Sequence, residues 1–508
     1  MSQQAIQRAY SAIQNEQWMQ GRVLCENLLE QEPENAEALH LYGHILGRLG
    51  ETGLALDKLQ LATLIAPRHP QYRYNYAVSL GEAGRQLEAA VQYQACLRYQ
   101  PNHLDALWNY GEMMRLGNHF EEAAVLFERF AREGGNYPQL QHRLGVTYAS
   151  LGRIEEAEAC FQSELDKAET HPATHWEYAL FKLSHEDFAT GFDHYRHRFA
   201  AGAENRVHCH DYGLPRWDGE WEKGATLLIH GEQGLGDEMM FASVLPEVIE
   251  QANQHDMTVI LLVKPALVRL FSYSFPDITI LPHRVGADVA DISRLPPITW
   301  QAAIGDLAVL FRKSESDFAK ARKPYLHADP DRVAWYKRYL EALEPGNQPE
   351  LRVGLMWGSN PLKLDESYIR WTQNRSIPPS LFNALSHLRS KVRFVSLQNP
   401  DRGAESGEMH KLDVIDLSTL QTDFYETAAL VSNMDLVVSV CTSVSHLAGA
   451  MGHPCIAALM KRADWRHGRT REQSYWYKNM QYFRQSEAGN WESVVARIGD
   501  HIGKMLTL

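Results

Sequence analysis

The loop at residues 231–238 (GEQGLGDE) contains the residue types best suited to acid–base chemistry. It follows the apolar run 225–230 and precedes a stretch that we expect to be helical from about residue 239 to 251. Glycine permits a tight turn there, and the helix dipole keeps a carboxylate in the first helical turn ionised. Asp237 is therefore a candidate general base for an acceptor hydroxyl, with an N-cap role as the alternative.

The same loop is poorly suited to a phosphate. Its three carboxylates, Glu232, Asp237 and Glu238, would repel an anion. It also lacks the Gly-Lys-Ser/Thr of a Walker loop and the glycine order GxGxxG. A phosphate would have to be bound by another part of the chain.

A second loop, at residues 440–449 (VCTSVSHLAG), suits an anion better. Hydroxyl side chains gather where a buried strand passes into a helix, and the free N–H groups at a helix start favour negative charge. The loop after the apolar run 352–358 adds the cations Lys363, Arg370 and Arg375. We therefore expect a pyrophosphate here, with a capping or packing role as the alternative for the histidine. The candidate ligands are Thr442, Ser443, His446 and Arg375.

Both loops lie where short apolar runs alternate with helical segments, which is the pattern of parallel α/β units. Two such open sheets in succession should bind a ligand between them, at the carboxyl ends of their strands. We assign the two lobes to 225–346 and 347–508. The expected strands are 225–230, 258–263 and 278–281 in the first lobe, and 352–358, 392–398, 414–417, 436–440 and 455–460 in the second.

The first 200 residues follow a repeat of 34 residues. Small residues let two helices approach closely, and a bulky residue fills the space beside them. This pattern resembles the tetratricopeptide repeat in six units and predicts a helical solenoid over 1–200, with a linker at 201–224. The small positions are Gly43, Ala77, Gly111, Gly145 and Ala179, then Ala55, Ala89, Ala123, Ala157 and Gly191; the bulky ones are Leu59, Tyr93, Phe127, Phe161 and Tyr195.

A solenoid of this kind has a concave face that accepts ligands. In the tetratricopeptide family the first helix of each repeat lines that face, which implies an acceptor-binding role for Tyr74, Asn75, Trp108 and Asn109. Asn75 and Asn109 share one repeat position. In the repeats of eukaryotic O-GlcNAc transferase, asparagines so placed hold the backbone of an extended protein acceptor. An amide suits this role because it both donates and accepts; solvated asparagines on an exposed face are the alternative.

The two α/β loops resemble those of the heptosyltransferase-like family 9 glycosyltransferases. GEQGLGDEMMFASVLP matches the GD-xxxxx-P signature of that family through Gly236, Asp237 and Pro246. VCTSVSHLAGAMGHP is similar to the donor loop, although Cys441 stands where the family has Asp. The resemblance extends to MWGSNP (356–361), NRSIP (374–378), ADWR (463–466) and WYKNMQYFRQ (476–485).

This resemblance implies a GT-B fold of two Rossmann-like lobes, the first facing the acceptor and the second binding a nucleotide-sugar. It implies metal-independent transfer with inversion at the anomeric carbon, so no metal ion or other cofactor is expected. Asp237 would be the base, Thr442 and His446 would contact the donor diphosphate, and Arg375 and Asn360 would complete the donor site. With its repeats, the chain resembles bacterial glycosyltransferases related to those that modify flagellin and other proteins.

The composition argues against several other classes. A net charge of −13 disfavours a broad nucleic-acid interface. Neither a secretory signal nor a membrane-spanning run is visible, so we expect a cytoplasmic protein. The six cysteines include no CxxC pair, which indicates neither a disulfide framework nor a zinc site. The stretch 208–211 (HCHD) cannot surround an ion without distant ligands.

Three functions follow from these observations. The leading hypothesis is an enzyme that glycosylates Ser or Thr hydroxyls of a protein, such as flagellin, held by the repeats. A second reading keeps the transferase but makes the acceptor a cell-envelope saccharide. The third is a repeat scaffold with an inactive transferase domain; Cys441 is its main support, and the intact Asp237, Thr442 and His446 argue against it.

Overall fold

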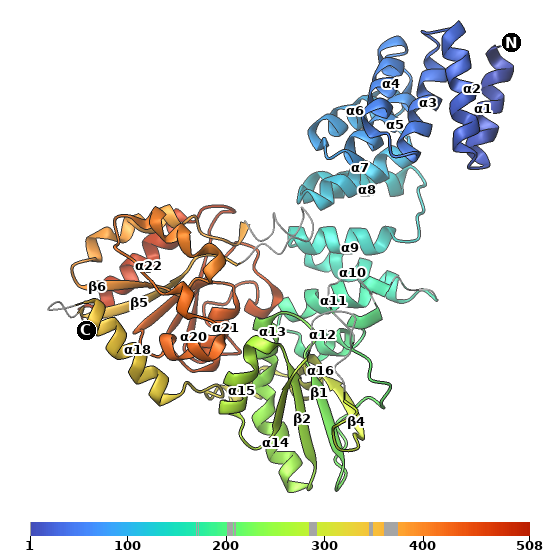
Figure 1. The fold of residues 1–508 in the computed structure, drawn as a ribbon. Coiled ribbons are helices and arrows are strands. Elements are labelled where there is room, and N and C mark those ends of the chain that lie inside the picture. Colours follow the sequence, from blue (N-terminus) through green and yellow to red (C-terminus); the bar gives the residue numbers. More distant parts are fainter. Residues whose placement is uncertain are drawn as a thin grey trace. The chain divides into compact units, whose positions relative to one another are not determined.

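The computed structural model describes residues 2–168, 170, 172–200, 207, 210–283, 292–344, 349–359 and 374–507. The chain forms two compact units, Met1–Thr174 and His175–Leu508 (Figure 1). An N-terminal helical repeat region is followed by an α/β region with two parallel sheets, which confirms the expected fold class. The division between the units falls before residue 200, where we expected the solenoid to end; the predicted domain boundaries remain predictions.

The first unit consists of helices that pack in consecutive pairs. Glycine allows the close approach within several pairs. A Cβ added to Gly43 would lie 2.6 Å from Leu59 Cγ, and one added to Gly111 would lie 2.8 Å from Phe127 Cε1. The helices are α1 (Ser2–Gln14), α2 (Trp18–Gln31), α3 (Ala36–Arg48), α4 (Thr52–Ile65), α5 (Pro70–Glu82), α6 (Gln86–Tyr99), α7 (Leu104–Leu116), α8 (Phe120–Arg132), α9 (Leu140–Leu151) and α10 (Ile154–Leu165).

The last helical pair, α11 (Pro172–Ser184) and α12 (Phe188–Tyr195), leads into the second unit. The bulky repeat residue Tyr195 is fully buried in the core of that unit. Phe192 packs beside it, with its ring centroid 6.2 Å from that of Trp465. The repeat pattern therefore continues into α12, but the side chains of this helix pack against the α/β fold.

The first sheet of the second unit has four parallel strands in the order β3-β2-β1-β4. The strands are β1 (Thr226–His230), β2 (Thr258–Val263), β3 (Thr279–Pro282) and β4 (Trp300–Ala303). Strand β4 was not predicted, because the short sequence WQAA has neither a long apolar run nor an alternation. Its helices are α13 (Leu235–Phe241), α14 (Leu245–Gln254), α15 (Val268–Ser274), α16 (Ile304–Phe311) and α17 (Glu315–Ala321).

Part of the predicted linker is docked on this sheet. Arg216 forms a parallel bridge with Gln301 of β4, and the Trp217 N–H donates to the Gln301 carbonyl at 2.8 Å. Trp217 is only 4% exposed. The C-terminal part of the predicted linker 201–224 is therefore packed against the edge of the sheet at β4 and is not a free connection between domains.

The second sheet has six parallel strands in the order β10-β9-β8-β5-β6-β7. The strands are β5 (Leu351–Met356), β6 (Val392–Ser396), β7 (Ile415–Asp416), β8 (Leu436–Val440), β9 (Cys455–Leu459) and β10 (Met480–Arg484), and β10 was not predicted. The helices that accompany this sheet are α18 (Pro330–Leu343), α20 (Phe424–Val431), α21 (Ser443–Ala450) and α22 (Glu492–Met505).

The two loops with candidate chemistry follow central strands of these sheets. Strands β1 and β8 are buried along their whole length, as expected for strands covered on both faces. The helix predicted after the first loop begins earlier than expected and is broken by a 3-10 turn at Ala242–Val244. Pro246 stands in the first turn of α14, where its missing N–H is tolerated.

No helix within the described ranges is long and apolar enough to cross a lipid bilayer.

Candidate functional site

Asp237 occupies the third position of α13, where its carboxylate folds back on the turn before the helix. Its Oδ2 accepts a hydrogen bond of 2.9 Å from the Gly234 N–H. Asp237 therefore caps the helix from inside its first turn and is not the N-cap residue. The side chain remains 21% exposed, so part of the carboxylate is accessible.

The other two acids of this loop are buried and paired. Glu232 receives three charged hydrogen bonds from Arg198, at 3.0 and 3.1 Å from Nε and 2.5 Å from Nη2, and burial raises its pKa. Glu238 is also fully buried. Burial acts to raise its pKa, but His283 at 3.2 Å and Lys264 at 2.8 Å lower it below the usual value. Asp237 is thus the carboxylate of this loop that is partly exposed.

Thr442 is the N-cap residue of α21, at the carboxyl end of β8. Its N–H donates to Ser445 Oγ at 3.3 Å, and its hydroxyl lies 3.0 Å from Ser439 Oγ. Ser443 is the first helical residue and is half-buried. The serines and the threonine thus build a capped helix start.

His446 lies in the first turn of α21 and is 5% exposed. Its Nδ1 is 2.9 Å from the Tyr477 hydroxyl. Burial lowers the pKa of His446 to about 4, so the imidazole is neutral at pH 7. In this state it can offer a hydrogen bond to an anion but no positive charge.

The two predicted loops meet at Gly236. A Cβ added to this residue would lie 2.8 Å from His446 Cδ2 and 3.4 Å from Ser443 Cα. The first turns of α13 and α21, which are about two hundred residues apart in the sequence, therefore touch. Only glycine permits this approach without displacement.

Arg466 reaches this contact, and Arg375 acts electrostatically on Cys441, which precedes α21. Arg466 donates from Nη2 to the Asp237 carboxylate and from Nη1 to Asp464 Oδ1 at 2.6 Å. Arg375 donates from Nη2 to Ser359 Oγ at 2.6 Å, in the loop after β5. Because β5 and β8 are neighbours in the sheet, the loops after both strands emerge at the same edge.

Charged side chains from both lobes influence the pKa of the Cys441 thiol. Burial raises the pKa of its thiol to about 11; Asp464 and Asp237 also raise it, while Arg375 and Arg466 lower it. The sulfur lies 3.0 Å from Nε2 of His467, whose pKa burial lowers to about 3. Cys441 and His467 are both neutral at pH 7, so neither side chain adds a charge to the start of α21.

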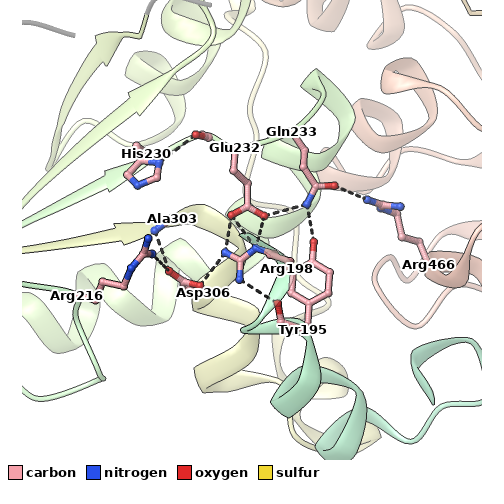
Figure 2. Close-up of polar contacts among 10 residues, drawn as sticks. Tyr195, Arg198, Arg216, His230, Glu232, Gln233, Ala303, Asp306 and Arg466 are labelled. Atoms are coloured by element: carbon pink, nitrogen blue, oxygen red, sulfur yellow. Dashed lines mark hydrogen bonds and ion pairs between the residues drawn. The ribbon is translucent and has the colours of Figure 1, made fainter. Parts of the chain in front are cut away.

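Gln233 connects the acidic loop to its surroundings, as Figure 2 shows. Its amide nitrogen donates to the Tyr195 hydroxyl at 2.5 Å and to Glu232 Oε1 at 2.9 Å. Its amide oxygen accepts from Arg466 Nη2 at 3.3 Å. On the far side of Glu232, Arg198 also donates to Asp306 Oδ1 at 2.7 Å. Sequence reasoning missed this network, whose members are brought together from separate elements.

The expected donor residue Asn360 lies outside the described residues, as do Lys363 and Arg370. Of the predicted donor-side residues, Thr442, Ser443 and His446 share the start of α21. Arg375 lowers the pKa of the thiol of Cys441, the residue just before that helix start. Arg466 lies in the ADWR stretch (463–466), which was one of several further resemblances in the sequence and predicted no role for the arginine.

In the first unit, the expected acceptor residues make contacts between neighbouring repeats. Asn75 Nδ2 is 2.5 Å from His40 Nε2, and Asn109 Nδ2 donates to the Tyr74 hydroxyl at 2.7 Å. Both amides are half-buried. The Trp108 ring packs among aromatic side chains, with its centroid 4.9 Å from that of Tyr137. These four residues therefore stabilise the solenoid, and a role in binding an acceptor would come in addition.

Across the parts of the chain that the structure describes, no group of three or more His, Cys, Asp or Glu side chains is arranged to hold a metal ion.

Comparison with known proteins supports the repeat assignment. A family model described as tetratricopeptide repeat matches residues 138–163, which cover α9 and most of α10. The chain is 29% identical over 487 residues to Protein FlbA of Caulobacter vibrioides, an alignment that covers 90% of this chain and 78% of that protein.

Several solved structures are similar to a part of the chain. One is Pseudomonas aeruginosa PilF, with 18% identity, 40% of this chain and 94% of that chain covered, and a TM-score of 0.35. Another is YrrB, described as a TPR protein with an unusual peptide-binding site, with 17% identity, coverage of 35% and 91%, and a TM-score of 0.32. The third is the type IV pilus biogenesis factor PilW, with 19% identity, coverage of 39% and 88%, and a TM-score of 0.32.

Proposed function

We propose that the α/β unit is an inverting GT-B glycosyltransferase of family 9 type, which moves a sugar from a nucleotide-sugar to a hydroxyl of a protein acceptor. The observation that carries this proposal is the contact of the two motif loops at Gly236. It brings a partly exposed carboxylate to a helix start that is rich in hydroxyls and is preceded by Cys441, on which Arg375 and Arg466 act electrostatically.

The donor diphosphate would bind at the start of α21. Its negative charge suits the positive end of the dipole of that helix and the Ser443 hydroxyl, with the neutral His446 as an additional hydrogen-bond partner. Arg375 supplies a planar group that can bind two phosphate oxygens. Such fixed donors stabilise the charge that develops on a leaving diphosphate.

The reaction would be a single displacement. The acceptor oxygen forms a bond to the anomeric carbon while the bond from that carbon to the diphosphate oxygen breaks. The proton of the acceptor hydroxyl passes to the Asp237 carboxylate, and the electron pair of the broken bond stays on the nucleoside diphosphate. Attack opposite to the leaving group inverts the anomeric carbon.

The protein acceptor would be a Ser- or Thr-containing segment, with flagellin as one candidate, held in the concave face of the solenoid in the cytoplasm. Holding the acceptor raises its effective concentration near the reacting groups without new contacts at the reacting atoms. An envelope saccharide is the alternative acceptor. Loss of activity is a third possibility, favoured by the uncharged pair of Cys441 and His467.

Two measurements test the proposal. A panel of UDP-, GDP-, dTDP- and ADP-sugars is screened by thermal shift, because a bound donor stabilises the fold by mass action. Glycopeptide mass spectrometry then compares cells with and without this chain. A stabilising nucleotide-sugar together with protein glycans that depend on the chain supports the proposal. Loss of an envelope saccharide with unchanged glycopeptides favours the alternative acceptor, and no stabilisation by any donor favours the scaffold.

A further inference from the structure

Arg466 has no role in the proposed reaction so far, yet it links the acidic loop at 231–238 to the second lobe. It lies in the 3-10 turn Trp465–His467 of the second lobe. From there its Nη2 reaches two residues of the first lobe, the Asp237 carboxylate and Gln233 Oε1. Its Nη1 is held by Asp464 Oδ1 in its own lobe, at 2.6 Å.

The ion pair is largely shielded from water. The Arg466 side chain is 11% exposed and that of Asp237 is 21% exposed. Burial acts to lower the pKa of Arg466, but the charges of Asp237 and Asp464 raise it well above the usual value. The guanidinium therefore stays charged, and its hydrogen bond to Asp237 is of the charge-assisted kind, about twice as strong as a neutral one.

Without Arg466, the Asp237 carboxylate would be held at one oxygen only. Its Oδ2 is fixed by the Gly234 N–H, while Arg466 fixes Oδ1. Gln233 holds the guanidinium from the other side, and Tyr195 and Glu232 hold Gln233 in turn (Figure 2). The rotation of the carboxylate is therefore determined by both lobes together.

We infer that Arg466 is a positioning residue for Asp237: it orients the carboxylate that accepts the acceptor's proton, and it does so from the opposite lobe. The inference rests on the proposed function, since it assigns a second residue to the same step. Misplacement of a reacting group by about 1 Å can cost about a hundredfold in rate. Loss of Arg466 should therefore lower kcat and leave the affinity for the donor nearly unchanged.

The test uses the full chain and the nucleotide-sugar that gives the largest thermal shift, with water as the acceptor. The rate is measured as release of nucleoside diphosphate at saturating donor, and donor Kd is measured by calorimetry. The variants are Arg466→Gln, Arg466→Lys, Asp237→Asn and the double variant Asp237→Asn with Arg466→Gln. Arg471→Gln is the matched control, because Arg471 also pairs with two carboxylates, Glu186 at 2.8 Å and Glu315 at 2.7 Å.

We expect Arg466→Gln to lower kcat by about 10- to 100-fold with donor Kd within about twofold. Arg466→Lys should restore part of the rate, because lysine keeps the charge but lacks the planar fork. In the Asp237→Asn background, Arg466→Gln should cost less than about threefold more, since a residue that acts through the carboxylate loses its effect when the carboxylate is absent. The control should keep the wild-type kcat.

Several outcomes overturn the inference. Wild-type kcat in a folded Arg466→Gln variant does so, and so do fully additive losses in the double variant. A tenfold weaker donor Kd with unchanged kcat would make Arg466 a donor ligand instead, for which its buried Nε–H, without a partner among the described residues, is suited. If Arg466→Gln does not fold, a lysine variant with both constants unchanged overturns it equally. A wild-type chain that binds a donor and never releases nucleoside diphosphate contradicts the proposed function, not this inference alone.

Discussion

Buried histidines show how strongly the environment of a single residue sets its chemistry. His40 in α3 is 4% exposed, and Asn75 Nδ2 lies 2.5 Å from its Nε2. Burial, with smaller contributions from His44 and His69, lowers the pKa of His40 to about 3. An imidazole that accepts at Nε2 from an amide is neutral, and a proton at this position would remove that hydrogen bond.

The low pKa of His40 predicts that the protein loses stability in acid. The unfolded chain takes up a proton at His40 below about pH 6.5, while the folded chain takes it up only near pH 3. The contribution of a neutral His40 is thus complete above pH 6.5 and is lost as the pH falls from there towards 3. Replacing His40 with Gln, which keeps an acceptor but does not titrate, should reduce the loss of unfolding free energy between pH 7 and 5 by on the order of 1–2 kcal/mol.

Urea unfolding at the two pH values measures this difference. The control is His119→Gln, because His119 is exposed and its replacement should leave the pH dependence unchanged. Equal pH dependence of wild type and His40→Gln would show that His40 does not contribute to acid unfolding.

Among the elements, the contact of α13 with α21 depends on a missing side chain. The Cβ of an alanine at position 236 would lie 2.8 Å from His446 Cδ2, so either the His446 ring or one of the two helix starts must shift. Either shift disturbs the contact between the turn that holds Asp237 and the loop 440–449, and the overall fold has no reason to change because the strands that carry the loops are untouched.

Gly236→Ala should therefore lower the rate of nucleoside diphosphate release by about 10- to 100-fold with a small change in melting temperature. Gly407→Ala is the control, since an added Cβ there meets nothing within 4 Å. The prediction is tested by steady-state rates and thermal melts of both variants. An alanine variant at position 236 with the wild-type rate would mean that the contact of the loops has no part in catalysis.

The repeat helices α5 and α7 carry Asn75 and Asn109, which are predicted to bind the backbone of a protein acceptor. Asn75 and Asn109 already bond His40 and Tyr74 in the preceding repeats, so the double variant Asn75→Ala with Asn109→Ala loses two hydrogen bonds worth about 1 kcal/mol each. A modest fall in stability is expected even if neither residue binds an acceptor.

The distinguishing measurement for these asparagines is kinetic. With the protein acceptor found by mass spectrometry, the double variant should raise KM for that acceptor by about 5- to 50-fold, which corresponds to about 1–2 kcal/mol of lost binding. Donor Kd should stay constant. Arg85→Ala, which breaks only an exposed pair with Glu88, serves as the control. An unchanged KM leaves both asparagines with a structural role alone.

At the scale of the whole molecule, the α/β unit includes the end of the repeat region. Arg198 follows α12 and is fully buried with Glu232, and both are 0% exposed. Removing one partner of a buried ion pair costs about 3–5 kcal/mol, because the other charge is left without compensation. Arg198 therefore belongs to the folding unit of the α/β half.

This assignment predicts different outcomes for two truncated chains. A chain of residues 172–508 keeps α11, α12 and Arg198 and should fold and bind the donor with nearly wild-type Kd. A chain of residues 207–508 leaves Glu232 unpaired and uncovers the core around Phe241, so it should be unfolded or melt far lower. Arg198→Met in the full chain is the matched single change. Thermal melts and donor calorimetry decide; equal stability of the two truncated chains would show that α12 is dispensable.

Local patterns in the sequence determined the repeats, most strands and the composition of both loops. The 34-residue step from Gly43 to Ala77 and the apolar run of β8 are properties of the order of residues along the chain, so they can be recognised without coordinates. Asp237, Thr442 and His446 were predicted from their places between a strand end and a helix start, together with the resemblance of both loops to those of family 9 glycosyltransferases. The strand β4 escaped prediction because its four residues have no pattern of their own; its place is set by pairing with β1.

Only the tertiary structure decided how these parts meet. The bond between Arg466 and Asp237 joins residues 229 positions apart, and that between Arg198 and Glu232 depends on where α12 packs. The tertiary structure also gives the three carboxylates of one loop different environments. Glu232 and Glu238 are buried and paired, whereas Asp237 is partly exposed. Burial, ion pairing and the close approach at Gly236 are properties of surroundings that come from distant segments, and no local pattern contains them.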